Sequence, residues 1–155
     1  MTSLPIGQLM NREAIMQGLY NLLNDSQAFV TVSRKLVMWD QLSPQQKPAV
    51  FIVQGPQEYF RNMEGTPPRV VLNVNLFIYT STNDPSVVPA SLMNAALDAI
   101  DVALAPTPYP PCLQTLGGTC SHCWIEGSTI LETGDLDGQG VAVIPLKILV
   151  GNTAR

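Results

Sequence analysis

The chain has 155 residues, of which 46% are hydrophobic and only 13% are charged. This is the length of one domain, and the charged fraction is about half of the roughly 25% that is usual in soluble domains. The composition excludes a disordered chain and a coiled coil, both of which need more charge. It favours a protein that has a stable partner or assembles with itself.

The formal net charge of −4 hides an uneven distribution along the chain. Residues 1–69 carry six basic and five acidic groups, whereas residues 70–146 carry seven acidic groups and no Lys or Arg. A protein that binds nucleic acid by neutralising phosphates needs clustered cations, and this pattern lacks them. Two interpretations remain open: an ordinary solvated acidic face, or a wall that lets DNA pass without holding it.

The sequence contains no apolar run close to the roughly 18–20 residues of a membrane span. Its first residues, MTSLPIGQLMNRE, lack the basic region and apolar block of a secretion signal. We therefore expect a soluble protein that is intracellular when made and has no membrane partner.

In the first half of the chain, residue patterns predict a helix and two short strands. The helix has apolar residues at helical spacing, and the strands are β-branched, aromatic or apolar. In chain order, the expected elements are an extended arm over 1–10, a helix over 11–24, a strand over 29–33, a connection over 35–48, a strand over 49–54 stopped by Gly55-Pro56, and a polar loop over 56–68.

Residues 69–80 form the clearest predicted strand. Successive residues of a strand point to opposite faces, so one face of this strand carries apolar residues and the other carries a mixture that includes Asn73 and Asn75. One buried face and one mixed face are typical of an antiparallel sheet. The buried set is expected to be Val70, Leu72, Val74, Leu76 and Ile78.

The second half begins with a turn and an alanine-rich helix, for which Ser86 is the expected N-cap and Leu104 the approximate end. An irregular Pro/Gly/Cys segment over 105–121 follows. Strands over 124–132 and 141–150 are expected to form a hairpin through Asp137-Gly138. Pro145 should make the last strand an edge strand or bulge it. The fold class predicted for the single domain 1–155 is α/β (α+β): a mainly antiparallel mixed sheet flanked by two helices, with a long C-terminal β-hairpin.

Cysteine and histidine gather in one segment, which makes a metal site the first chemistry to consider. Cys120 and Cys123 have knuckle spacing, but Cys112 would be the third ligand and His122 is adjacent to Cys123. Zinc needs four ligands that can surround it, and no second pair exists in the sequence. We expect no metal site, and free thiols rather than a disulfide. The pattern assigns no role to these four residues.

Signatures of catalysis are also missing from the sequence. It has one histidine, no G-x-S-x-G, no H-E-x-x-H, and no Gly-Lys-Ser/Thr after Gly117-Gly118. We expect no catalytic residues, no cofactor and no enzyme activity.

The order of elements resembles the tail-terminator and tail-completion proteins of long-tailed bacteriophages. The resemblance covers most of the chain and is architectural. The residues that carry it are Asn11–Leu23, Pro48–Ile52, Pro67–Thr80 running into Ser86–Leu104, and Trp124–Val150. The segment 105–121 is longer than a minimal member of these families would need.

The resemblance implies a virion structural protein that caps the head-proximal end of the tail tube as a ring, commonly a homo-hexamer. Such a ring ends tube polymerisation and joins the tail to the head. Its implied partners are copies of itself, the tail tube protein, a head-tail connector or stopper protein, and double-stranded DNA that passes through the lumen without specific binding. The implied location is the virion, with the host cytoplasm during assembly.

Two sets of residues are candidates for these contacts. Tyr59, Phe60 and Arg61 are predicted at the subunit interface, because aromatics and Arg are enriched there; the alternative is that Phe60 packs on its own domain. Glu132, Asp135 and Asp137 are predicted to face the lumen, and the alternative puts this hairpin tip on the outer rim or against the connector. Other functions left open are another neck or tail-completion subunit, or a small-molecule-binding or hydrolytic domain.

Overall fold

The computed structural model describes residues 10–60, 69–133 and 137–151. The expected arm therefore lies outside the described residues except for Met10. The elements in chain order are α1 (Arg12–Asp25), β1 (Thr31–Ser33), the 3-10 turns η2 (Trp39–Gln41) and η3 (Pro44–Gln46), β2 (Ala49–Phe60), β3 (Arg69–Ser81), α2 (Pro89–Ala103), β4 (His122–Ile125), β5 (Ile130–Glu132) and β6 (Gln139–Val150).

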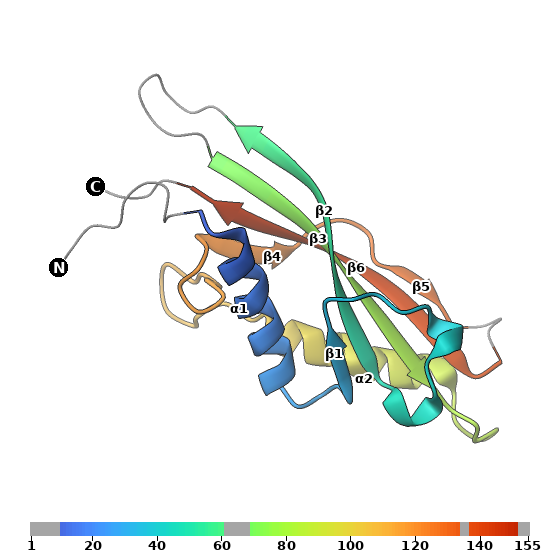
Figure 1. Ribbon diagram of the computed structural model, residues 1–155. Coiled ribbons are helices and arrows are strands. Elements are labelled where there is room, and N and C mark those ends of the chain that lie inside the picture. Colours follow the sequence, from blue (N-terminus) through green and yellow to red (C-terminus); the bar gives the residue numbers. More distant parts are fainter. Residues whose placement is uncertain (1–9, 61–68, 134–136, 152–155) are drawn as a thin grey trace, which may run out of the picture.

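One mixed sheet organises these elements (Figure 1). Its strand order is β1-β2-β3-β6-β4, and β5 pairs with β6 on the same side as β4. All pairs are antiparallel except β1 with β2, which is parallel. The predicted fold class, a mainly antiparallel mixed sheet with two helices and a C-terminal strand hairpin, is confirmed.

The main core lies between the two helices and one face of the sheet. The alternation predicted for residues 70–78 is confirmed, since every second residue of β3 from Val70 to Ile78 is buried in this core. From α1 come Ile15, Met16, Leu19 and Leu23, and from α2 come Met93, Ala96 and Ile100. Both helices therefore cover the same face.

A smaller core lies on the opposite face of the sheet. It contains Leu42, Ala49, Phe51 and Tyr79, with the Phe51 and Tyr79 rings 5.4 Å apart. Val37 and Trp39 pack against this cluster. The connection predicted over 35–48 thus covers the second face, but only at the end of the sheet where β2 begins.

The two helices start in different ways. Asn11 caps α1, and its side-chain oxygen accepts a hydrogen bond from the Ala14 backbone N–H at 3.0 Å. The Ser86 cap predicted for α2 is wrong: Ser86 donates to Asp84 in the preceding turn, and α2 begins at Pro89 after Val88. Proline suits this first helical position because its missing N–H would have no partner there.

Strand β2 does not stop at Gly55-Pro56, as the sequence predicted, but continues to Phe60. A bulge shifts the register between Gln54 and Gln57 and takes up the proline, which cannot donate to the ladder. Gly55 is needed where the chains come close, because a Cβ there would lie 3.2 Å from the Asn73 carbonyl oxygen. Tyr59 and Phe60 therefore belong to a strand and not to a loop.

Pro145 has a different effect from the one predicted. β6 is neither an edge strand nor bulged at Pro145, which pairs with Asn75 in an unbroken register. Instead, the strand expected over 124–132 is split into β4 and β5, which end on either side of Pro145. The Pro145 carbonyl accepts a hydrogen bond from the Glu126 backbone N–H at 3.2 Å. In an antiparallel strand the N–H and the carbonyl of one residue point to the same side, so the missing Pro145 N–H faces the gap between β4 and β5.

Candidate assembly surfaces

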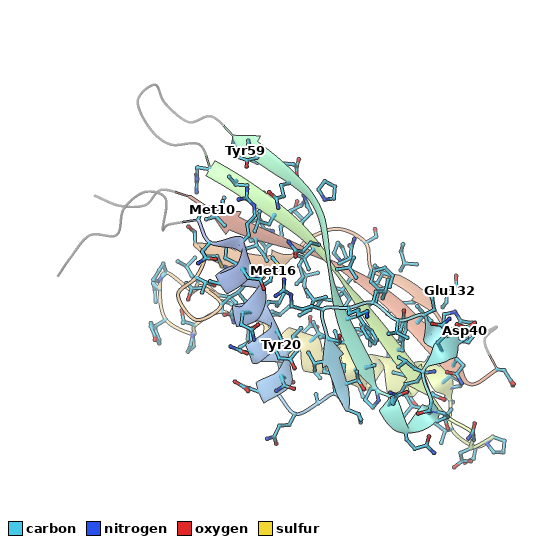
Figure 2. All side chains as sticks on the ribbon, in the orientation of Figure 1. Met10, Met16, Tyr20, Asp40, Tyr59 and Glu132 are labelled. Atoms are coloured by element: carbon cyan, nitrogen blue, oxygen red, sulfur yellow. The ribbon has the colours of Figure 1, made fainter. Side chains whose placement is uncertain are left out.

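The two predicted sets of contact residues lie at opposite ends of the long strands (Figure 2). Tyr59 pairs with Val70 at one end of β3, whereas Glu132 is in line with Tyr79, nine residues further along. At roughly 3.3 Å per residue, the two ends are about 30 Å apart. The structure does not bring the two sets together into one site.

At the first end, Tyr59 and Phe60 are 63% and 48% exposed. Arg12 of α1 holds Tyr59, donating to its hydroxyl at 2.8 Å and to the Gln57 side chain at 2.9 Å. Neighbouring residues of a strand point to opposite faces, so Phe60 projects from the face away from α1. The two aromatics do not form one patch, and Arg61 lies outside the described residues.

At the second end of the long strands, the exposed side chains include three carboxylates. Glu132 and Asp137 are exposed, and Asp40 of η2 lies at the same end (Figure 2). Lys47 is the nearby cation, but it is only 8% exposed and donates to the Gln139 side chain. Burial lowers the pKa of Lys47, partly offset by Asp40. The exposed charge at this end is therefore negative; Asp135 lies outside the described residues.

Two edges bound the sheet among the described residues, and part of one is already covered, because the Cys123 backbone N–H of β4 donates to the Gln114 carbonyl oxygen at 2.8 Å. The β1–β2 edge consists of β1 and of residues 52–60 of β2, which extend past the end of β1 at Ser33. The β4–β5 edge consists of β4 and β5. Ile130 and Leu131 on this edge are 61% and 48% exposed. Residue patterns along the chain indicate neither edge; the proline within the last strand is the one signal in the sequence that the neighbouring strand is interrupted.

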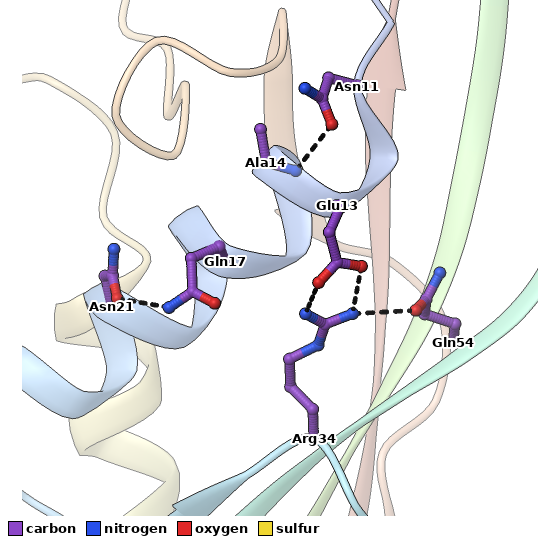
Figure 3. Close-up of polar contacts among 7 residues, drawn as sticks. All are labelled: Asn11, Glu13, Ala14, Gln17, Asn21, Arg34 and Gln54. Carbon is purple, nitrogen blue, oxygen red and sulfur yellow. Dashed lines mark hydrogen bonds and ion pairs between the residues drawn. The ribbon is translucent and has the colours of Figure 1, made fainter.

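A hydrogen-bonded ion pair sits beside the β1–β2 edge (Figure 3). The Arg34 guanidinium donates to both Glu13 carboxylate oxygens, at 2.5 and 3.0 Å, and to the Gln54 amide oxygen at 3.4 Å. Arg34 lowers the pKa of Glu13 through this hydrogen bond and its charge. The pair joins the start of α1 to the chain that follows β1, and Lys35 next to it is exposed.

A polar network lies on the face of the sheet that the helices leave free. Lys147 Nζ donates to the Asn73 side-chain oxygen at 2.7 Å and lies 3.9 Å from the Glu58 carboxylate. The Asn73 amide donates to Glu58 and to the Pro56 carbonyl. Nearby on β4, the His122 and Trp124 rings stack 5.2 Å apart. This network pairs its charges internally and presents no convergent reactive group.

The Cys/His segment packs on α1 and forms no shared site. Cys112 is exposed, Cys120 half-buried and Cys123 buried, and all three are free thiols. His122 Nδ1 accepts from the Gln114 backbone N–H at 3.1 Å. Within residues 10–60, 69–133 and 137–151, no three His, Cys, Asp or Glu side chains are grouped to hold a metal ion.

We expect thiol labelling to separate the three cysteines. Burial raises the pKa of Cys120 and of Cys123 to about 12. At pH 8 only about one such thiol in ten thousand is ionised, and the thiolate is the reactive form. Mass spectrometry after brief iodoacetamide treatment at pH 8 should find one label on the native protein, on Cys112, and three after unfolding. Cys112→Ser should remove the native label, and rapid native labelling of Cys120 or Cys123 would contradict this assignment.

A cavity of about 180 Å³ lies between α2 and the sheet, and larger hollows of about 350–520 Å³ lie elsewhere on the surface, one of them lined by Glu13, Arg34 and Lys35. Ligand pockets usually measure about 300–1,000 Å³ and contain a few convergent polar groups. The residues that line the cavity beside α2 carry no titratable side chain: Ala28, Pro48, Thr80, Ser81, Leu92, Ala95, Ala96 and Ala99. The size and lining of the cavity beside α2 therefore do not favour a small-molecule or hydrolytic site within it.

Comparisons with known proteins add little to this description. No protein-family model matches the sequence, and no curated protein matches it. Among solved structures, the chain is similar to a chain from the "Virion of native gene transfer agent (GTA) particle", with 13% identity and a TM-score of 0.47. The similarity covers 90% of this chain and 93% of the other. A likeness of this size establishes neither a family nor a function.

Neither described helix is suited to cross a membrane, since none within the described ranges combines the necessary length and apolar character.

Proposed function

We propose that this chain is a virion structural protein that forms a ring, a homo-hexamer, at the head-proximal end of a phage tail tube. In this role it ends tube polymerisation and offers its other side to the head connector or stopper. The proposal rests on the architectural resemblance described above and on the exposed surface of the sheet. It does not involve catalysis or a cofactor.

The observation that carries the proposal is the placement of exposed apolar side chains. Tyr59 and Phe60 at one end, and Ile130 and Leu131 on the β4–β5 edge, are between 48% and 63% exposed. A chain with only 13% charged residues has few ions with which to keep such surfaces apart. Contacts between copies would remove these side chains from water, and each buried CH₂ group contributes about 0.8 kcal/mol.

The same surface argues against the alternative of a small-molecule-binding domain. Such a domain should be a monomer with a deep pocket, whereas the cavity beside α2 is small and without titratable groups and the larger hollows, of about 350–520 Å³, are open to the surface. Another neck or tail-completion subunit remains a second candidate, because it would use the same kind of surface and differ only in its partner.

Light scattering after size-exclusion chromatography, together with micrographs of the purified protein, tests the proposal. We expect rings whose mass is six times the 16.8 kDa of the subunit. Added to its cognate tube protein during polymerisation, the ring should shorten the tubes by capping them. A monomer at all concentrations would contradict the proposal, and rings that leave tube length unchanged would favour another neck subunit.

The end of the long strands that carries Asp40, Glu132 and Asp137 should affect the rate at which DNA passes through the ring. We propose that Glu132 and Asp137 lie at a mouth of the lumen, where they repel a duplex that carries about one charge per 1.7 Å. Reversing both to Lys, in particles that still assemble, should slow genome ejection and make its rate depend on salt, because the added cations are screened over about 8 Å in physiological salt. The matched control is reversal of Asp98 and Asp101 on the exposed side of α2. Identical ejection rates across salt would show that the hairpin tip does not face DNA.

A further inference from the structure

The turn that follows α2 presents an exposed surface without charge. Residues 102–125 contain no Asp, Glu, Lys or Arg. Within them, residues 105–112 form a turn, which we call the Pro/Tyr turn, and its Tyr109 is 65% exposed. The four prolines of this turn are also exposed: Pro106, Pro108, Pro110 and Pro111. Charged side chains are depleted and aromatic ones enriched where proteins meet, so this composition is typical of an interface.

Hydrogen bonds fix the shape of the Pro/Tyr turn. The Thr107 backbone N–H donates to the Leu113 carbonyl oxygen at 3.1 Å. The Gln114 side-chain amide donates to the Ala105 carbonyl oxygen at 2.9 Å. The prolines add stiffness, because the ring of each one fixes its backbone φ angle. A surface that is already ordered loses little conformational entropy when a partner covers it, which favours binding.

The Pro/Tyr turn offers mainly hydrogen-bond acceptors. Each of its four prolines has a carbonyl group but no N–H. Among the residues that the structure describes, no donor contacts the carbonyl oxygens of these prolines. A partner that removes the turn from water must therefore supply donors, because a buried acceptor without a donor is costly.

A hollow of about 520 Å³ beside β1 supplies such donors. Its lining includes Lys35, Leu36 and the ion pair of Glu13 with Arg34. Lys35 is exposed, and within the described ranges its ammonium group contacts no acceptor. Leu36 is 39% exposed, and Met38 next to it along the chain is 53% exposed. The hollow thus combines free donors with exposed apolar surface, which the Pro/Tyr turn requires of a partner.

The hollow and the Pro/Tyr turn lie on opposite sides of the subunit. The hollow borders β1 and β2, at one end of the strand order β1-β2-β3-β6-β4. The base of the turn meets the other end, where the Cys123 backbone N–H of β4 donates to the Gln114 carbonyl oxygen at 2.8 Å. In Figure 1, α1 lies between the 105–121 segment and β1. A contact between two such surfaces can repeat from copy to copy, and it gives a ring when the rotation closes.

We propose that the Pro/Tyr turn of one copy docks in the hollow beside β1 of the next copy. Tyr109 covers Leu36 and Met38, and the Lys35 ammonium donates to proline carbonyl oxygens of the turn. A second copy of this chain is the occupant because one chain carries both complementary surfaces, on opposite sides. This inference rests on the self-assembly in the proposed function and names the surfaces that produce it.

Cys112 provides a probe for this contact, because it ends the Pro/Tyr turn and is exposed. A few subunits are labelled on Cys112 with a maleimide that carries a diazirine, at a concentration below assembly. They are then mixed with an excess of unlabelled, isotopically heavy subunits, concentrated until rings form, and illuminated. Mass spectrometry should find the crosslink in heavy peptides that contain Leu36 and Met38. The heavy mass shows that the crosslink joins two copies.

Variants of the full chain test both sides of the contact. Tyr109→Ser removes the ring that covers Leu36, and Lys35→Glu replaces the donor by an acceptor. Each should raise the concentration for half-assembly roughly tenfold or more, measured by light scattering across a dilution series. Two matched controls should stay within about threefold of the unaltered chain: Lys35→Arg, which keeps the donors, and Val88→Ser, at a side chain that is 63% exposed at the start of α2. Circular dichroism confirms that each variant is folded.

The outcomes separate this contact from the proposed ring. Rings in which the Cys112 probe crosslinks elsewhere, or that form normally with Tyr109→Ser, would overturn the docking and leave the ring intact. Rings whose probe crosslinks only to added tube protein would overturn it too and assign the Pro/Tyr turn to the tube. An unaltered chain that is a monomer at all concentrations would overturn the proposed self-assembly and this contact together.

Discussion

Leu76→Ala should lower the free energy of unfolding by about 2–5 kcal/mol, because it leaves a cavity in the middle of the main core. Leu76 is fully buried on β3, where Ile52 on β2 and Ile144 on β6 lie directly beside it. All three side chains pack under the helices, so the surrounding structure cannot collapse freely into the gap. Urea unfolding followed by circular dichroism, at a concentration below assembly, measures the loss.

Val102→Ala provides the matched control for this measurement. Its side chain is 77% exposed on α2, and surface substitutions of this kind usually change stability by less than about 0.5 kcal/mol. An equally small effect of Leu76→Ala would mean that the helix-covered face of β3 is not the core.

Gly18→Ala should also destabilise the protein, by about 1–3 kcal/mol, although alanine is normally the better helix former. Gly18 lies within α1, and a Cβ at this position would come 2.4 Å from the Leu116 carbonyl oxygen. That oxygen is held in place, since it accepts from the Thr119 hydroxyl at 2.9 Å and Leu116 itself is 1% exposed. The added methyl group must therefore push the 105–121 segment away from the helix.

Asn94→Ala separates this clash from helix propensity. Asn94 is exposed within α2, so alanine there should be neutral or stabilising by a few tenths of a kcal/mol. In the Gly18→Ala protein, the release of Leu116 should also expose Cys120 and Cys123 to thiol reagents under native conditions. Stabilisation by Gly18→Ala, with unchanged thiol protection, would show that the 105–121 segment does not pack on α1.

The assembly surfaces illustrate how far residue type alone can guide such predictions. Aromatic enrichment directed attention to Tyr59 and Phe60, and both are exposed. Their type did not reveal that they point to opposite faces, or that Arg12 from α1 holds Tyr59. Ile130 and Leu131 were missed because an apolar strand residue is usually buried. Only the strand order shows that β5 lies at the edge of the sheet.

The sequence by itself determined the features that depend on local periodicity. The alternation from Val70 to Ile78 specified which face of β3 is buried, and helical spacing placed Ile15 and Leu19 of α1 in the core. These patterns suffice because neighbouring residues decide which side of a strand or helix is apolar. They also determined the class of fold, a mainly antiparallel mixed sheet with two helices.

The tertiary structure alone decided what each proline does and where the sheet ends. Pro56 lies within β2 because a bulge takes it up, and Pro145 lies within a central strand because β4 and β5 stop on either side of it. The cost of a missing N–H depends on whether a neighbouring strand needs that donor. That neighbour comes from residues far away in the chain, so the edges of the sheet become visible only when the strands are paired.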